Sequence, residues 1–385
     1  MSTARPRAAT AAIFLANGTG IGVWASSIAP IKLELALSDG QLGFSLLAFA
    51  IGAILTMTVT GHVTAHFGSA RVALTASFAF AAALLLPAIM PNLVTLWLGI
   101  LVLGACNGAM DVSMNAHGAL VETTRGRPIM SSLHAAFSLG CLLGSRMGGW
   151  LLAAGYGPLG LQGAAAAVAG LLTLAAAFNM QVPGAGRPAE PPVGFVMPSR
   201  AILGIGALAF LCMFAEGAVA DWAAVYLVSV VGVTAATATW GFSGFAFAMT
   251  VGRLLGDRVV HALGRPRVVM LGAALAAIGL ALTLVWPRVE AAALGYALAG
   301  LGIANIIPVM FSAGGRRTPA HPGIGVAMAA TCGYAGFLVS PPLIGFAADH
   351  VGLRNALMVL ALAMVVIALT ARRALRGLDA AESER

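Results

Sequence analysis

Long runs of apolar residues, separated by short polar stretches, follow one another along almost the whole chain. There are twelve runs, and each is long enough to cross about 30 Å of hydrocarbon as a helix, which takes roughly 20 residues. The runs lie near 10–29, 41–60, 72–90, 93–119, 129–154, 160–180, 202–231, 236–256, 268–286, 291–314, 323–347 and 355–371. This pattern predicts an all-α membrane protein with 12 transmembrane helices.

The composition agrees with lipid as the main solvent. Hydrophobic residues make up 60% of the chain and charged residues 9%, whereas an ordinary soluble domain has about 25% charged residues. The four cysteines all lie in apolar runs, so they predict neither a disulfide framework nor a metal site. No cofactor is expected. Only MSTARPR precedes the first run, so a cleaved signal peptide is not expected.

The arginines predict the orientation in the membrane. If the N-terminus is cytoplasmic, the inner segments hold sixteen arginines and the outer loops hold Lys32, Arg288 and Arg354. This positive-inside bias places both termini in the cytoplasm, and the bacterial inner membrane is the expected location. The net charge of +8 does not indicate nucleic-acid binding, because the arginines are scattered rather than clustered.

The two halves of the chain resemble each other. GFSLLAFA at 43–50 returns as GFSGFAFA at 241–248, an offset of 198 residues. Trp24 and Trp222, Asn107 and Asn305, and other pairs match at the same offset. Six spans separate the copies, so the halves have the same orientation and form a parallel duplication. The expected domains are a six-helix bundle at 1–180, a cytoplasmic linker at 181–200, rich in proline and glycine, and a second bundle at 201–385.

This arrangement resembles the major facilitator superfamily over nearly the whole chain. The resemblance implies two parallel-related six-helix bundles that rock about a central site near the bilayer midplane. It also implies that the first, fourth, seventh and tenth helices line the cavity. The expected partners are a small-molecule substrate, protons and the lipid bilayer, and the expected state is a monomer.

The loops between helices depart partly from that family's signature. GHVTAHFGSAR keeps Gly61, Gly68 and Arg71, but Ala65 and His66 follow where an acid is expected. In GDRVVHALGRPR, His261 stands at a position where an acid is common. The resemblance therefore implies a weakened cytoplasmic gate, in which Asp257 or the histidines His66 and His261 are candidates to replace the missing acids.

The fifth run contains GCLLGSRMGG, which resembles an antiporter pattern with Ser145 in place of a proline. Small residues at this spacing also let helices approach closely. We favour this packing interpretation over an antiport-specific one.

Charged residues inside membrane helices are costly and usually face a cavity or a partner. Away from the helix ends, the charged residues are Asp111, Arg146, Glu216, Asp221, Arg253 and Asp257. Glu216 is the first candidate for proton or substrate coupling, because its own helix has no cation; the alternative is a static hydrogen bond to Asn17 or Thr19. Arg253 and Asp257 are four residues apart and predict an intrahelical gate or structural pair.

The other candidates each have two interpretations. Asp111 is a proton site or an acceptor for Asn115. Asp221 is a further candidate for proton coupling. His134, expected near Asp111 and Asn115, is a proton relay or a packed histidine. Arg146 neutralises Asp221 or binds an anionic substrate. The tryptophans are packing anchors or flank a ring-shaped solute. The candidate lining of the cavity is Asn17, Trp24, Asn107, Asn115, Arg146, Trp222 and Asn305.

No enzyme motif is present. The chain has no G-x-x-x-x-G-K-[ST], so ATP is not expected to drive it directly, and it has no H-E-x-x-H, C-x-x-C or G-x-S-x-G. We expect a secondary transporter that takes its energy from an ion gradient, as symporter or antiporter. An uncoupled facilitator and a receptor built on a transporter fold are the alternatives. The substrate and the direction of transport cannot be predicted from the sequence.

Overall fold

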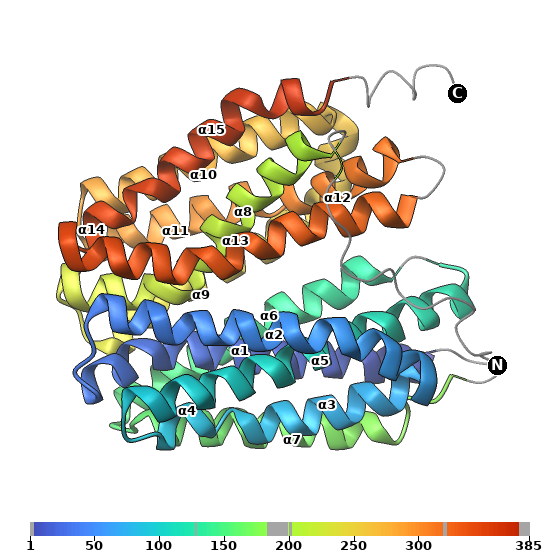
Figure 1. Cartoon of the computed structure of the whole chain (residues 1–385), viewed down its shortest axis with the longest axis horizontal. Helices are drawn as coiled ribbons and strands as arrows, with labels where there is room; N and C mark the ends of the chain where they lie inside the picture. Colours follow the sequence, from blue (N-terminus) through green and yellow to red (C-terminus); the bar gives the residue numbers. More distant parts are fainter. Residues whose placement is uncertain (1–3, 128, 183–198, 200–201, 319–321, 377–385) are drawn as a thin grey trace. The chain divides into compact units, whose positions relative to one another are not determined.

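The structure is a computed structural model that describes residues 4–127, 129–182, 199, 202–318 and 322–376, without the side chains of 257, 322 and 323. The described residues form helices and no strand (Figure 1). The chain divides into two compact units. Unit 1 comprises Met1–Pro192 and Thr234–Ser243, and unit 2 comprises Val193–Val233 and Gly244–Arg385.

Unit 1 is built from seven helices and the start of α9. Its helices are α1 (Ala4–Glu34), α2 (Asp39–Phe67), α3 (Ser69–Ala83), α4 (Leu86–Ile89), α5 (Leu93–Arg125), α6 (Met130–Ala153) and α7 (Pro158–Ala177). The third apolar run is divided between α3 and α4, which the hydropathy pattern does not reveal.

Unit 2 contains the remaining helices. They are α8 (Leu203–Tyr226), the π-helical turn η1 (Leu227–Val231), most of α9 (Ala235–Leu263), α10 (Arg265–Val285), α11 (Val289–Ile303), α12 (Ile306–Arg317), α13 (Pro322–Val351), α14 (Leu353–Ala356) and α15 (Met358–Ala374). The tenth run is interrupted between α11 and α12, at Ala304 and Asn305.

Ten helical segments of the described chain are long and apolar enough to cross a membrane. The fifth and eighth predicted spans, which correspond to α6 and α9, are not among them. These helices have 24 and 29 residues, enough for about 30 Å, but they are less apolar than the ten segments. The number of twelve spans stays a prediction. The linker expected at 181–200 lies largely outside the described residues.

Local chemistry determines where several helices begin. Ser38 and Gln41 form a reciprocal capping box at the start of α2, and Asn92 accepts from the Thr95 N–H at the start of α5. The Glu122 carboxylate accepts from the N–H groups of Ile129 and Met130, at 2.6 and 2.9 Å, at the start of α6. A negative charge at this position also complements the helix dipole.

The glycines of the fifth run pack α6 against α1. A Cβ added at Gly140 would overlap the carbonyl oxygen of Leu15, and one at Gly144 would overlap that of Thr19. Gly18 and Gly22 of α1 make the reciprocal approaches to the backbone of α6. This geometry supports the packing interpretation of GCLLGSRMGG.

Equivalent contacts in the two units correct the offset of the repeat. Gly104 approaches the Phe49 carbonyl, and Gly300 approaches the Phe245 carbonyl, so both partners differ by 196 residues (300 − 104 and 245 − 49). Gly68 and Gly264, with φ of +87° and +76°, differ by the same number. The sequence matches at 198 therefore lie two residues, or about 200° of helix, out of structural register.

Candidate functional site

An ion pair joins two helices within unit 2. Nη2 of Arg253 on α9 lies 3.5 Å from Oε1 of Glu216 on α8. This contact is longer than the 2.7–2.9 Å of a strong charge-assisted hydrogen bond. The Glu216 and Arg253 side chains are 21% and 22% exposed. The pair is therefore loose and accessible rather than sealed in a core.

Glu216 lies near the middle of its span. It is 13 residues after Leu203 and 15 before Val231 in the segment Leu203–Val231, so it is about 20 Å from either end at 1.5 Å per residue. No cation lies on the helix of Glu216 itself, and its cationic partner comes instead from α9. The Asp257 side chain, the partner predicted for Arg253, lies outside the described residues.

Aromatic side chains of α13 border this position. A Cβ at Gly217, the residue after Glu216, would overlap the ring of Phe337. The rings of Tyr334 and Phe337 have their centroids 6.3 Å apart. Glycine at 217 therefore allows an aromatic ring to lie directly against α8 beside the carboxylate.

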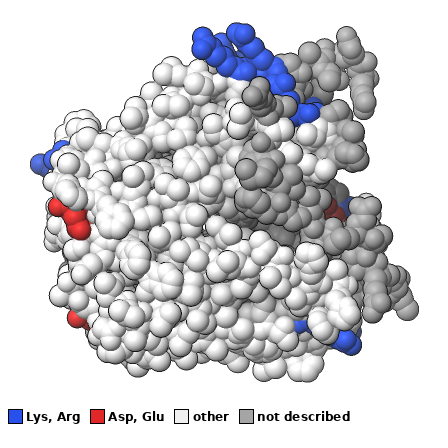
Figure 2. All heavy atoms as spheres, viewed as in Figure 1, with Lys and Arg blue, Asp and Glu red and all other residues white. Residues whose placement is uncertain are grey.

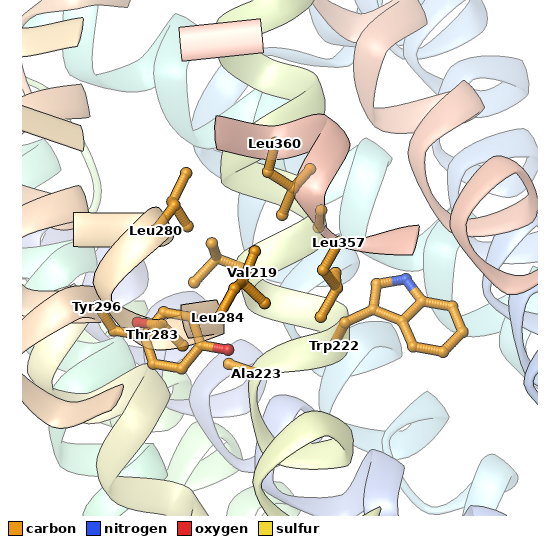
Figure 3. Close-up of a pocket in the computed structure, with 10 residues that line it drawn as sticks. Val219, Trp222, Ala223, Leu280, Thr283, Leu284, Tyr296, Leu357 and Leu360 are labelled. Carbon is orange, nitrogen blue, oxygen red and sulfur yellow. The ribbon is translucent and has the colours of Figure 1, made fainter. Parts of the chain in front are cut away.

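Asp221 and Trp222 lie further along α8. Asp221 is half-buried, whereas Trp222 is fully buried, and its Nε1 has no hydrogen-bond partner in the described part of the chain. Trp222 lines a small apolar pocket with Val219, Leu284 and Leu357 (Figure 3). This pocket offers few polar groups, so Glu216 and Arg253 are better placed for a polar solute.

Asn305 lies where α11 ends and α12 begins. Its Nδ2 donates to the Gly252 carbonyl at 3.0 Å, and a Cβ at Gly256 would overlap its Oδ1. The Asn305 side chain thus holds the break between α11 and α12 against α9, at Gly252, the residue before Arg253.

In unit 1, Asn17 connects α1 to α5. The buried Asn17 amide donates to Asn107 Oδ1 at 2.9 Å and lies 3.3 Å from Met110 Sδ. The partly exposed Asn107 makes this contact, whereas Asn305 bonds to backbone. Asn107 and Asn305, which the sequence matches at an offset of 198, therefore make different contacts. This difference is expected, because the structural offset is 196 and the two residues do not occupy equivalent positions.

Asp111 and Asn115 form a local pair on α5. Asn115 Nδ2 donates to the Asp111 carbonyl at 2.9 Å and lies 3.2 Å from its Oδ1. His134, on α6, makes an edge-to-face contact with Phe14, with ring centroids 5.4 Å apart. The structure brings Asp111 and Asn115 together as predicted, and the membership of His134 in this cluster stays a prediction.

Hydroxyl groups gather around Ser145 within unit 1. Its Oγ donates to the Thr239 carbonyl at 3.2 Å and accepts from Ser243 Oγ at 2.9 Å. The neighbouring Arg146 donates to Thr239 Oγ1 at 3.1 Å, and its guanidinium carbon is 3.6 Å from the Trp240 ring centroid. Sequence reasoning missed Thr239, Trp240 and Ser243 because they are neutral, although their clustering in ATATWGFS was visible.

The remaining candidates divide between core and surface. Trp24 is 5% exposed and Gly61 is also buried. Arg71, His66 and His261 are exposed. Gly68 has a positive φ of 87°, which explains why glycine is required at that loop.

Comparison with known proteins places this geometry in context. The family model described as Major Facilitator Superfamily matches residues 205–384. An uncharacterized MFS-type transporter of Yersinia pestis is 37% identical over 363 residues, covering 94% of each chain. Membrane protein MosC of Rhizobium meliloti is 34% identical over 356 residues, covering 92% of this chain and 86% of MosC.

A solved structure shares the fold. The crystal structure of the nucleoside transporter NupG superposes with a TM-score of 0.74 at 14% identity, covering 96% of this chain and 99% of NupG. At this identity the similarity concerns the fold alone.

Proposed function

Because the chain belongs to the major facilitator superfamily of membrane transporters, we propose that it is a proton-coupled secondary transporter of a small organic solute. In this proposal it works by alternating access in a bacterial inner membrane, with both termini in the cytoplasm. The Glu216–Arg253 pair is the observation that carries the proposal. It is loose, reachable and near the middle of a span.

Proton binding at Glu216 would change the charge that Arg253 experiences. An ionised carboxylate attracts the guanidinium, whereas a protonated one is neutral and can also donate a hydrogen bond. Protonation therefore weakens the ion pair and frees donors of Arg253 for a solute. Coupling between proton and solute follows, because each changes the free energy of binding the other.

Within unit 1, α5 carries a separate set of candidate solute-binding groups. Asn107, Asp111 and Asn115 are partly exposed on α5, and amide and carboxylate groups supply both donors and acceptors. The Asp111–Asn115 contact stays within one helix, so Asp111 is in our proposal a binding group rather than the coupling acid.

The aromatic rings beside Glu216 favour a solute with a face that can stack. Phe337 and Tyr334 offer such a surface. Nucleosides, as ring-shaped polar molecules, therefore belong in the screen together with sugars, organic acids and amphipathic drugs. NupG motivates their inclusion only through its fold.

The test combines a ligand screen with transport in proteoliposomes. A solute that raises the unfolding temperature of the purified protein is measured in two modes, uptake driven by an imposed pH gradient and exchange without one. Glu216→Gln should abolish gradient-driven uptake while exchange continues. Glu290→Gln, at an exposed acid at the start of α11, is the matched control. Unchanged gradient-driven uptake by Glu216→Gln would remove Glu216 from the coupling role.

An uncoupled facilitator is the second candidate. Arg253 favours it, because a neighbouring cation stabilises the ionised form of a carboxylic acid. A facilitator would show equal transport with and without the pH gradient in the wild-type protein. The sign of the gradient that drives accumulation distinguishes symport from antiport.

A further inference from the structure

One edge of unit 2 brings together the start of α10 and the end of α15. At the opposite ends of these helices, Arg354 donates to the carbonyls of Leu284 and Val285 at 2.7 and 3.2 Å. The chain from α14 into α15 therefore runs antiparallel to α10. Arg267 is 17 residues before Leu284, and Ala371 is 17 residues after Arg354. Both are thus about 26 Å from this contact, at the same level.

Arginines gather at this level. Arg267 on α10 and Arg372 and Arg373 on α15 are all exposed. Arg317, at the end of α12, donates to the carbonyls of Ala374 and Arg376 at 3.3 and 2.9 Å. This contact adds a further exposed cation and fixes the end of α15. We call Arg267, Arg317, Arg372 and Arg373 the arginine edge.

No carboxylate that the structure describes in unit 2 lies at the arginine edge. Glu216 and Asp221 are well inside the α8 span. Glu290 follows the end of α10, and Asp349 precedes Arg354 in sequence, so both belong to the opposite end. Neutralising charge for the edge must therefore come from outside the described part of this unit.

Exposed apolar side chains continue from the arginines along the same helix faces. On α10, Leu271 and Ile278 are 50% and 61% exposed and follow Arg267 by four and eleven residues. On α15, Leu362 and Leu369 are 61% and 76% exposed and precede Arg373 by eleven and four residues. These spacings keep each set on one face.

We propose that the arginine edge binds an anionic phospholipid of the surrounding bilayer. Its phosphate would lie on Arg267, Arg372 and Arg373, and its acyl chains on the leucines and Ile278. Guanidinium groups match phosphate oxygens in geometry and charge, and basic clusters at the ends of membrane helices attract anionic lipids at about 1 kcal/mol per cation. Figure 2 shows Lys and Arg atoms gathered where α15 ends, beside a largely uncharged surface.

Native mass spectrometry of the detergent-solubilised full chain tests this proposal. The probes are phosphatidylglycerol and phosphatidylcholine at equal concentration. The wild-type protein should retain phosphatidylglycerol in preference, and high salt should release it, because salt screens exposed charges. The triple variant R267Q/R372Q/R373Q should reduce its retention on the order of tenfold or more.

The matched control is R125Q/R127Q/R288Q, which removes the same net charge elsewhere and should retain the lipid as the wild type does. Thermal unfolding of each variant shows whether it is folded. Equal retention of both lipids by the wild type, or undiminished phosphatidylglycerol retention by a folded triple variant, would overturn the proposal. So would retention that appears only after Asp379, Glu382 and Glu384 are neutralised, because the acidic tail would then occupy the edge.

Discussion

The guanidinium of Arg146 lies over the ring face of Trp240, with its central carbon 3.6 Å from the ring centroid. Trp240 is 53% exposed, so this cation–π contact is expected to contribute about 0.5–1 kcal/mol to stability. Trp240→Phe should retain part of that contribution and Trp240→Leu should lose it. The measurement is a double-mutant cycle of thermal unfolding with Arg146→Met. Additive effects in the cycle would show that the contact contributes nothing.

The Glu216–Arg253 pair should behave asymmetrically when its members are removed. Arg253→Gln leaves a carboxylate without this partner inside the membrane and should destabilise the protein by about 1–2 kcal/mol, less than a fully buried pair because both groups are partly exposed. The double variant E216Q/R253Q should recover most of that loss. Unfolding in detergent at neutral pH measures both. A double variant less stable than Arg253→Gln would contradict a direct pairing.

Gly144 should tolerate no side chain. Gly144→Ala places a methyl group against the Thr19 carbonyl, so α1 and α6 must separate, at a cost of about 1–3 kcal/mol. Gly163→Ala on α7 is the matched control, since a Cβ there meets nothing within 4 Å. The control should gain up to about 1 kcal/mol from helix propensity. Equal unfolding temperatures for the two variants would argue against the close approach.

Gly126 and Gly68 both have a positive φ, but asparagine should replace only Gly126 at low cost. Gly126 ends α5 in the left-handed helical region, at φ 66° and ψ 22°, which asparagine also adopts. Gly68 has φ 87° and ψ 140°, a region almost restricted to glycine. Gly126→Asn should therefore cost less than 1 kcal/mol, whereas Gly68→Asn should cost about 1–3 kcal/mol. Thermal unfolding distinguishes them, and equal losses would contradict the backbone assignment.

The hydropathy pattern was sufficient to predict an all-helical membrane protein, because runs of about 20 apolar residues have few other stable solutions. It could not locate the interruptions after Ala83 and Ile303, since hydropathy is continuous across both. It also could not show the partner of Glu216. Arg253 is 37 residues away on another helix, whereas spacing along one helix pointed to Asp257.

The repeat was visible in the sequence, yet its register was not. Pairs of Trp and of Asn match at 198 residues. Glycines match at 196, but a glycine match carries little information because the chain has 48 glycines. The backbone approaches at Gly104 and Gly300 and the positive φ of Gly68 and Gly264 distinguish the two offsets.

The offset of 196 residues has a consequence for how the protein can be altered. Applied to the charged residues of the spans, it pairs Asp111 with Ile307, Arg146 with Pro342, Glu216 with Gly20, Asp221 with Ala25, Arg253 with Met57 and Asp257 with Gly61. At this offset the backbone approaches recur, but each of these six ionisable groups is paired with a residue that carries no charge. A charged residue in one half can therefore be replaced by the neutral residue at the equivalent position of the other half, which shows what this backbone accepts there.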